Sequence, residues 1–195
     1  MATKTVMIVG VGGQGAILTS KILINGLIQK GYDVKQSEIH GMAQRGGSVS
    51  TQVIWGDKVY APTVGKGYVD IMVAFEKMEA VRYCEFIKPD GIAIINDYEM
   101  QSQTTAAGLV EYPQGTIEAM KENFNTIVFP AADIAKELGS TKCMNVVLFG
   151  AMSKVLGLED IDWEEVIRKT VPEKFVELNL KAYHAGVEAA EKAKA

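Results

Sequence analysis

The feature that most constrains this chain is a glycine-rich turn between a short apolar segment and a longer helical pattern. Residues 6–9 read Val-Met-Ile-Val, a continuous apolar run typical of a strand buried on both faces. This run leads directly into Gly10-Val-Gly-Gly-Gln-Gly15, and an amphipathic helical pattern follows over residues 16–30. Gly31 ends that pattern, and residues 32–37 read as a second strand. Together these segments predict a βαβ unit and therefore an α/β layered fold.

The rest of the chain continues to alternate strands and helices. Residues 49–55 and 59–60, joined at Gly56-Asp57, predict a β-hairpin inserted after the second strand. The remaining pattern predicts strands over residues 71–75, 92–95 and 126–129 and helices over residues 76–87, 132–138, 142–156, 163–170 and 173–192, with a turn at residues 89–91. We therefore expect a Rossmann-like three-layer fold with a mainly parallel sheet and a helical C-terminus. Because no linker or repeat interrupts the pattern, residues 1–195 are expected to form a single domain.

Composition excludes several classes of function. The chain carries 20 Lys and Arg against 24 Asp and Glu, so it has no basic excess with which to neutralise nucleic acid. Its two cysteines, Cys84 and Cys143, lie far apart and in no CxxC motif, which excludes a zinc or four-cysteine iron–sulfur site within this chain. No apolar stretch approaches the roughly 20 residues of a membrane span. A cytoplasmic protein without a metal site or a membrane anchor is expected.

The glycine turn has two interpretations. Gly10, Gly12 and Gly15 form GxGxxG between a predicted strand and a predicted helix, where glycines and a helix N-terminus suit a phosphate group. Alternatively, the glycines only allow the strand and helix to pack closely. An NAD site would also want an acidic residue at the end of the second strand, whereas the first acid, Glu38, comes one position late.

A second distinctive segment, Ser37-Glu-Ile-His-Gly-Met-Ala-Gln-Arg-Gly-Gly-Ser48, follows the second strand. It concentrates Glu38, His40, Gln44 and Arg45 at the sheet edge where α/β proteins bind ligands. The plainer interpretation is a loop turned by Gly46 and Gly47 and held by a pair formed by the arginine and the glutamate.

Taken together, the two glycine segments resemble the gamma-subunit family of 2-oxoacid:ferredoxin oxidoreductases, and the indolepyruvate type most of all. The resemblance also covers Ala74-Phe75-Glu76, Asn96, Asn145 and Gly150, and it extends to about residue 190.

The resemblance implies an enzyme that is active only as a heteromer. Members oxidatively decarboxylate a 2-oxoacid, reduce ferredoxin and transfer the acyl group to coenzyme A. Thiamine diphosphate, Mg²⁺ and the 4Fe-4S clusters are expected on a larger partner subunit, and ferredoxin is reached through the complex. For this chain, the resemblance implies coenzyme A or phosphate binding and subunit contacts.

The residues implicated fall into two groups. Glu38, His40 and Arg45 are expected at the catalytic site. The expected cofactor-binding residues are Gly10, Gly12, Gly13, Gln14, Gly15, Gln44, Gly46, Gly47, Asn96 and Asn145.

Three alternatives stay open at the level of sequence. One is a stand-alone oxidoreductase that uses NAD(P) or flavin on a Rossmann-like fold, and a second is an adenylating enzyme with a related glycine loop. The third is a non-enzymatic scaffold of the same complex.

Overall fold

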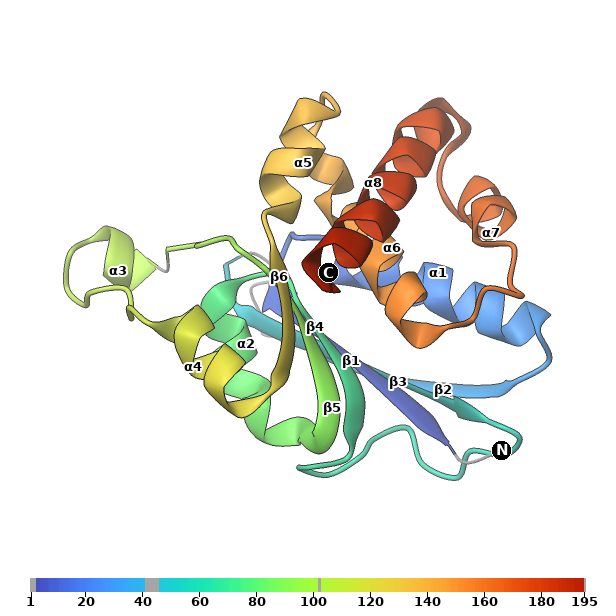
Figure 1. Cartoon of the computed structure of the whole chain (residues 1–195), viewed down its shortest axis with the longest axis horizontal. Helices are drawn as coiled ribbons and strands as arrows, with labels where there is room; N and C mark the ends of the chain where they lie inside the picture. Colours follow the sequence, from blue (N-terminus) through green and yellow to red (C-terminus); the bar gives the residue numbers. More distant parts are fainter. Residues whose placement is uncertain (1–2, 41–45, 102, 195) are drawn as a thin grey trace.

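A six-stranded mixed sheet forms the centre of the computed structural model, which describes residues 3–40, 46–101 and 103–194 (Figure 1). Its strands lie in the order β2-β3-β1-β4-β5-β6. Strands β1, β4, β5 and β6 run parallel, while β3 runs antiparallel to both β1 and β2. The strand bounds are β1 Lys4–Val11, β2 Asp33–His40, β3 Ser48–Gly56, β4 Val69–Ala74, β5 Ile87–Asn96 and β6 Asn125–Phe129.

Helices cover both faces of this sheet, which confirms the three-layer α/β fold (Figure 1). One face carries α1 (Ala16–Gln29), α5 (Ala131–Glu137), α6 (Met144–Leu156), α7 (Trp163–Thr170) and α8 (Val176–Lys194). The other carries α2 (Lys77–Tyr83) and α4 (Thr116–Asn123). Shorter helical elements are α3 (Gln103–Ala106), η1 (Cys84–Phe86), η2 (Thr141–Cys143) and η3 (Glu173–Phe175).

The C-terminal helices are held at very short separation by two glycines. A Cβ atom on Gly150 of α6 would lie 2.1 Å from the Tyr183 carbonyl oxygen, and one on Gly186 of α8 would lie 1.8 Å from the Val147 carbonyl oxygen. Only glycine permits such backbone contact. The position of α6, whose first turn borders the site described below, therefore depends on this contact with α8.

The predicted hairpin of residues 49–55 with residues 59–60 is wrong, because residues 49–55 pair with other strands. Residues 58–60 form no strand, and β3 pairs with β2 on one side and β1 on the other. The apolar run over residues 53–55 is buried between two neighbouring strands, which stabilises it better than a short two-stranded ribbon could. The Val59 N–H instead donates to Asp33 Oδ2 at 2.8 Å. The hairpin after the second strand thus joins β2 to β3.

Two further local predictions need correction. Residues 89–91 were expected to form a turn, but they lie inside β5, where the pairing with β4 shifts register between Val69 and Ile71. This irregularity accommodates Pro89 and Gly91, which a regular central strand would not. The helix predicted over residues 76–87 is divided into α2 and η1, and helix α4 was not predicted at all.

Candidate functional site

The two glycine segments of the sequence lie against each other at the carboxyl end of β1. The Gly12 N–H donates to the Gly47 carbonyl at 2.8 Å, and the Gly46 N–H donates to the Gly12 carbonyl at 3.3 Å. The sequence pattern placed the second segment at the ligand-binding edge of the sheet, and the structure shows that the first segment meets it there. The Gly12 N–H is therefore already bonded, whereas the first turn of α1 has backbone N–H groups without an intrahelical acceptor.

Gly10 and Gly15 are required for different reasons. A Cβ on Gly10 would lie 2.9 Å from Phe75 Cβ, so Gly10 permits close packing of β1 against the end of β4. Gly15 precedes α1 with φ of 92°, and its Cβ would lie 2.8 Å from Asn145 Nδ2. Gly13 also has positive φ. The backbone at Gly15 therefore combines a left-handed conformation with a close approach to α6.

Gln14 and Asn96 bond to the backbone around the turn. Gln14 Oε1 accepts from the Val11 N–H at 2.7 Å, and its Nε2 donates to the Phe75 carbonyl at 3.3 Å. Asn96 Nδ2 donates to the same carbonyl at 3.1 Å, while its Oδ1 accepts from the Ala132 N–H at 3.3 Å. Both amides fix the ends of β1, β4 and β5 relative to one another. Of the two, Gln14 also lines the cleft described next.

A cleft of about 750 Å³ lies beside the glycine turn, between α1, α6 and the segment after β5. The N-terminal ends of α1 and of α6, the latter reached through η2, border it, so both helix dipoles place partial positive charge there. Among the described residues, no side chain caps α1. The lining residues are Gly12, Gly13, Gln14, Gly15, Leu18, Gly46, Tyr98, Met100, Ala132, Thr141, Lys142, Met144 and Asn145.

Asn145 connects the two helices at this cleft. Its side chain, in the first turn of α6, is buried, and Nδ2 donates to the Gly15 carbonyl at 3.3 Å. Its backbone carbonyl accepts from Thr19 Oγ1 at 3.2 Å. Within the described part of the chain, Oδ1 has no hydrogen-bond partner. The amide therefore holds α1 and α6 together and keeps one acceptor uncommitted, which is unusual for a buried polar atom.

A smaller hollow of about 290 Å³ lies on the opposite side of the glycine turn. It is lined by Glu38 and His40 from the end of β2 and by Gly12, Gly13 and Gly15, which the larger cleft shares. The side chains of Glu38 and His40 are exposed, and Gln36 Nε2 donates to Glu38 Oε1. The predicted site residues Gln44 and Arg45 lie outside the described residues.

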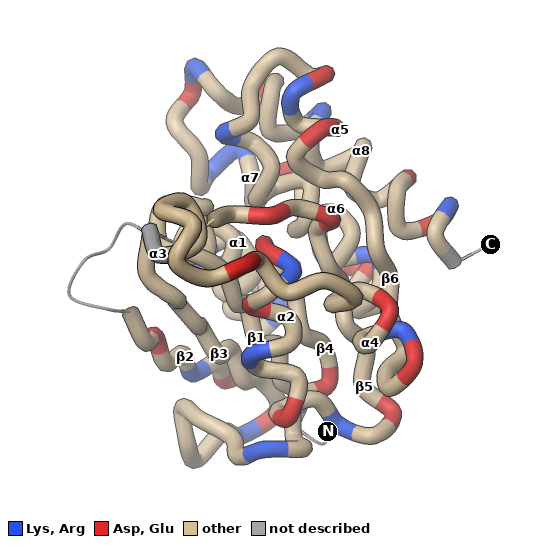
Figure 2. The backbone as a smooth tube through the Cα atoms, turned by 90° about the vertical axis from the view of Figure 1, so that its left-hand side faces the viewer, with Lys and Arg blue, Asp and Glu red and all other residues tan. Residues whose placement is uncertain are grey.

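Several residues at the cleft were not predicted from the sequence. Lys142 supplies a cationic side chain to the lining, and Tyr98 and Met100 reach it from the segment after β5. No motif marks these residues, because distant parts of the chain bring them to the glycine turn. Acidic and basic positions are interspersed over the backbone as a whole (Figure 2). No group of metal ligands is found among the described residues, nor is there a described helix long and apolar enough to cross a membrane.

The fold and the cleft define an α/β protein with a glycine turn suited to an anionic ligand. Comparison with known proteins is more specific: residues 5–189 match the pyruvate ferredoxin/flavodoxin oxidoreductase family, and the chain belongs to that family.

Two relatives match along nearly their whole length. Indolepyruvate oxidoreductase subunit IorB of Archaeoglobus fulgidus is 40% identical over 188 residues, covering 93% of this chain and 92% of that protein. The same subunit from Thermococcus kodakarensis is 37% identical, with 97% of each chain covered.

Solved structures agree. The gamma subunit of keto/oxoacid ferredoxin oxidoreductase from Geobacter sulfurreducens gives a TM-score of 0.72 at 27% identity, covering 97% of this chain and 99% of that one. A 2-oxoglutarate:ferredoxin oxidoreductase from Magnetococcus marinus, solved with 2-oxoglutarate, coenzyme A and succinyl-CoA bound, gives 0.75 at 20% identity over 98% of this chain and 32% of that chain. This second likeness shows the fold.

These relatives confirm the predicted resemblance: the chain is a subunit of a 2-oxoacid:ferredoxin oxidoreductase. Family membership does not favour a stand-alone enzyme that uses NAD(P) or flavin.

Proposed function

We propose that this chain supplies the coenzyme A-binding part of an indolepyruvate-type oxidoreductase. In the overall reaction the 2-oxoacid loses CO₂, two electrons pass to ferredoxin, and the coenzyme A thiol loses its proton and takes up the acyl group. The indolepyruvate preference is supported by relatives of that name at 37–40% identity. Relatives named for ketoisovalerate and 2-oxoglutarate are less similar, at 28–29% identity.

The observation that carries coenzyme A binding is the convergence of two helix N-termini and Lys142 on the cleft of about 750 Å³. The donors and partial charges at a helix N-terminus bind phosphate groups, which coenzyme A carries at its nucleotide end. Asn145 Oδ1 adds an acceptor, which the pantetheine amides or a ribose hydroxyl of coenzyme A could satisfy after a small adjustment of the buried amide. The cleft is large enough for part of such a ligand.

Glu38 and His40 border the smaller hollow across the glycine turn, and we assign this side to the reacting end of the ligand. The resemblance also implicates Gln44 and Arg45, which belong to the same sequence segment as Glu38 and His40. Arg45 would bind a phosphate or a substrate carboxylate through two parallel hydrogen bonds. Replacing Arg45 by Ala should therefore lower acyl-CoA formation while decarboxylation continues. Unchanged dependence on coenzyme A would contradict this role.

Thiamine diphosphate, Mg²⁺ and the iron–sulfur clusters are assigned to a larger partner subunit. A 4Fe-4S cluster needs four thiolates, and this chain has two cysteines, both free, with Cys143 buried. The residues of this chain therefore do not fit such a cluster. Free cysteines also agree with a reducing, cytoplasmic location.

The decisive experiment is anaerobic affinity purification of the native complex through this chain. Viologen reduction would then be measured with indolepyruvate, pyruvate and 2-ketoisovalerate, with and without coenzyme A. We expect a brown complex whose activity requires coenzyme A and is highest with indolepyruvate. Higher activity with another 2-oxoacid would correct the substrate. If coenzyme A binds only to a partner subunit, the proposed role of this chain is wrong and the chain is a non-enzymatic scaffold of the complex.

A further inference from the structure

Two glutamates that the proposed mechanism does not use are buried at the start of α2. Glu76 is 1% exposed and Glu79 is 4% exposed, directly after the carboxyl end of β4. A buried carboxylate is strongly destabilising unless hydrogen bonds compensate for lost hydration. The partners of these two side chains therefore indicate what they are for.

Glu76 joins α2 to a distant segment of the chain. Its Oε2 caps the helix by accepting from the Glu79 N–H at 3.0 Å. Its Oε1 accepts from the Tyr112 hydroxyl and from the Met100 N–H, the latter at 3.4 Å. Residues 98–101 and residues 103–113, which include α3 (Figure 1), follow β5 and are thus each tied to the same carboxylate.

Glu79 makes the corresponding connection to Ser48, the first residue of β3. Its Oε2 accepts from the Ser48 hydroxyl, and its Oε1 accepts from Arg82 Nε at 3.0 Å. The Tyr83 hydroxyl lies 3.2 Å from Ser48 Oγ, which adds a second contact from the same helix. The last residue of the second glycine segment, where β3 begins, is therefore fixed to α2.

The two tied segments form a wall of the ligand cleft. Gly46 and Met100 line both the cleft of about 750 Å³ and a separate hollow of about 280 Å³. Glu76, Glu79 and Tyr112 line the smaller of these two cavities. The carboxylates thus lie behind the wall, where they can hold Gly46 and Met100 in place without touching a ligand.

We propose that Glu76 and Glu79 are positioning residues that fix the Gly46–Met100 wall of the coenzyme A cleft. The inference rests on the proposed function, since it assigns coenzyme A to that cleft. Loss of either anchor should widen the cleft and weaken ligand binding, while the reacting groups remain unchanged.

The state of the Tyr112 phenol supports this arrangement. Burial and the adjacent Glu76 carboxylate raise the pKa of Tyr112 well above the ordinary value for tyrosine. The hydroxyl therefore stays protonated, and able to donate to Glu76, above the pH at which an exposed tyrosine ionises.

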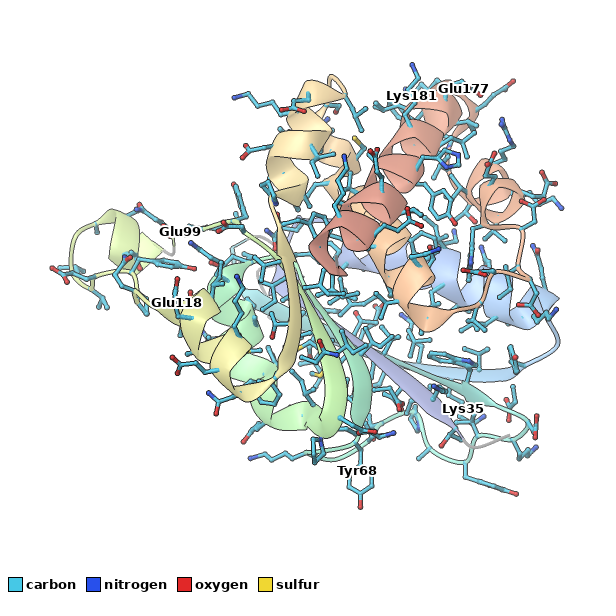
Figure 3. All side chains as sticks on the ribbon, in the orientation of Figure 1. Lys35, Tyr68, Glu99, Glu118, Glu177 and Lys181 are labelled. Carbon is cyan, nitrogen blue, oxygen red and sulfur yellow. The ribbon has the colours of Figure 1, made fainter. Side chains whose placement is uncertain are left out.

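The test compares Tyr112→Phe with Tyr68→Phe in the assembled enzyme. Tyr68 is exposed and directly precedes β4 (Figure 3), at the opposite end of the sheet from the strand ends that border the cleft, so its variant controls for loss of a tyrosine hydroxyl. We expect Tyr112→Phe to accelerate amide hydrogen exchange at Met100 about tenfold and to raise KM for coenzyme A by a similar factor. The kcat should change little, and Tyr68→Phe should match the wild type.

A second pair of variants tests Glu79. Glu79→Gln keeps an acceptor for Ser48 and should retain near wild-type KM, whereas Glu79→Ala should raise KM and accelerate exchange over residues 46–50. Unchanged exchange in both Tyr112→Phe and Glu79→Ala would overturn the anchoring. Faster exchange with unchanged KM would overturn the connection to the cleft.

The proposed function is tested separately in the wild type. Coenzyme A should protect the amides of residues 12–18 from exchange. If it protects none of them, coenzyme A does not occupy this cleft, and the assignment of the cleft fails even where the variants loosen the wall. If it protects them and the variants change nothing, only the positioning role fails.

Discussion

The two sides of the Gly46–Met100 wall differ in whether their polar groups have hydrogen-bond partners within the chain. On the α2 side, each oxygen of Glu76 and Glu79 accepts a hydrogen bond from within the chain. On the side of α1 and α6, described side chains leave the start of α1 uncapped and Asn145 Oδ1 unpaired. Buried polar groups that are internally satisfied stabilise a particular arrangement, whereas uncommitted groups beside a cleft retain capacity for a ligand.

Whether a polar side chain is bonded within the chain distinguishes structural residues from candidate ligand-binding residues more clearly than its residue type does. Gln14 and Asn96 are polar residues at the site edge, yet both amides bond to backbone groups of the turn and its neighbours. Lys142 carries no motif, yet it faces the cleft. The comparison predicts that changes to the scaffold side alter stability or cleft shape, and that changes to the open side alter ligand affinity directly.

The largest effect should follow from Gly186→Ala. The added methyl would meet the Val147 carbonyl oxygen at 1.8 Å, so α8 must move away from α6 and carry the packing of α6 with it. We expect a loss of about 3 kcal/mol of stability, seen as a lower Tm of the assembled enzyme. Lys181→Ala on the exposed side of α8 (Figure 3) is the control and should leave Tm nearly unchanged. An unchanged Tm in Gly186→Ala would mean that the α6–α8 contact is looser than described.

How far the sequence predicts this structure depends on the range of the interactions involved. The glycine turn, α1 and α7 follow from local patterns, and α7 was predicted with its observed bounds, Trp163–Thr170. The position of β3 between β2 and β1 was not predictable, because an apolar strand does not specify its partners. Pairing of β3 with the two long strands β2 and β1 is more favourable than a short hairpin closed at Gly56-Asp57.

The same distinction applies to the site. The motifs placed each glycine segment next to a strand end, but the contact between the two segments appears only in the structure. The motifs did not reveal that Gln14 and Asn96 share the Phe75 carbonyl, or that Glu76 holds Tyr112. These contacts join residues distant in sequence, and only the three-dimensional packing shows which polar groups remain available.

A second, smaller effect is expected when the glycines at the two ends of α1 are each replaced by alanine. The comparison distinguishes a loss caused by backbone strain from a loss of ligand binding. Gly15 and Gly31 flank α1 with φ of 92° and 90°, but only at Gly15 would a Cβ meet a neighbour, Asn145. The left-handed backbone should cost both Gly15→Ala and Gly31→Ala about 1–2 kcal/mol of stability. Gly15→Ala should lose more, because its Cβ would also meet Asn145. Only Gly15→Ala should also lose affinity for coenzyme A, by about tenfold or more, measured by calorimetry on the complex. Equal affinities in the two variants would place the ligand elsewhere.

The smallest effect concerns Lys142, the exposed cation of the open side. An exposed charge interacting with a phosphate contributes roughly 0.5–1 kcal/mol, so Lys142→Ala should raise KM for coenzyme A about two- to fivefold. Lys136→Ala, at an exposed position on α5 outside the cleft lining, should have no effect.

Because salt screens exposed charges, the difference between Lys142→Ala and wild type should shrink as ionic strength rises to about 1 M. The loss caused by Gly15→Ala should persist there, since it arises from backbone geometry. A salt-independent defect in Lys142→Ala would show that this side chain shapes the cleft and does not attract the ligand by charge.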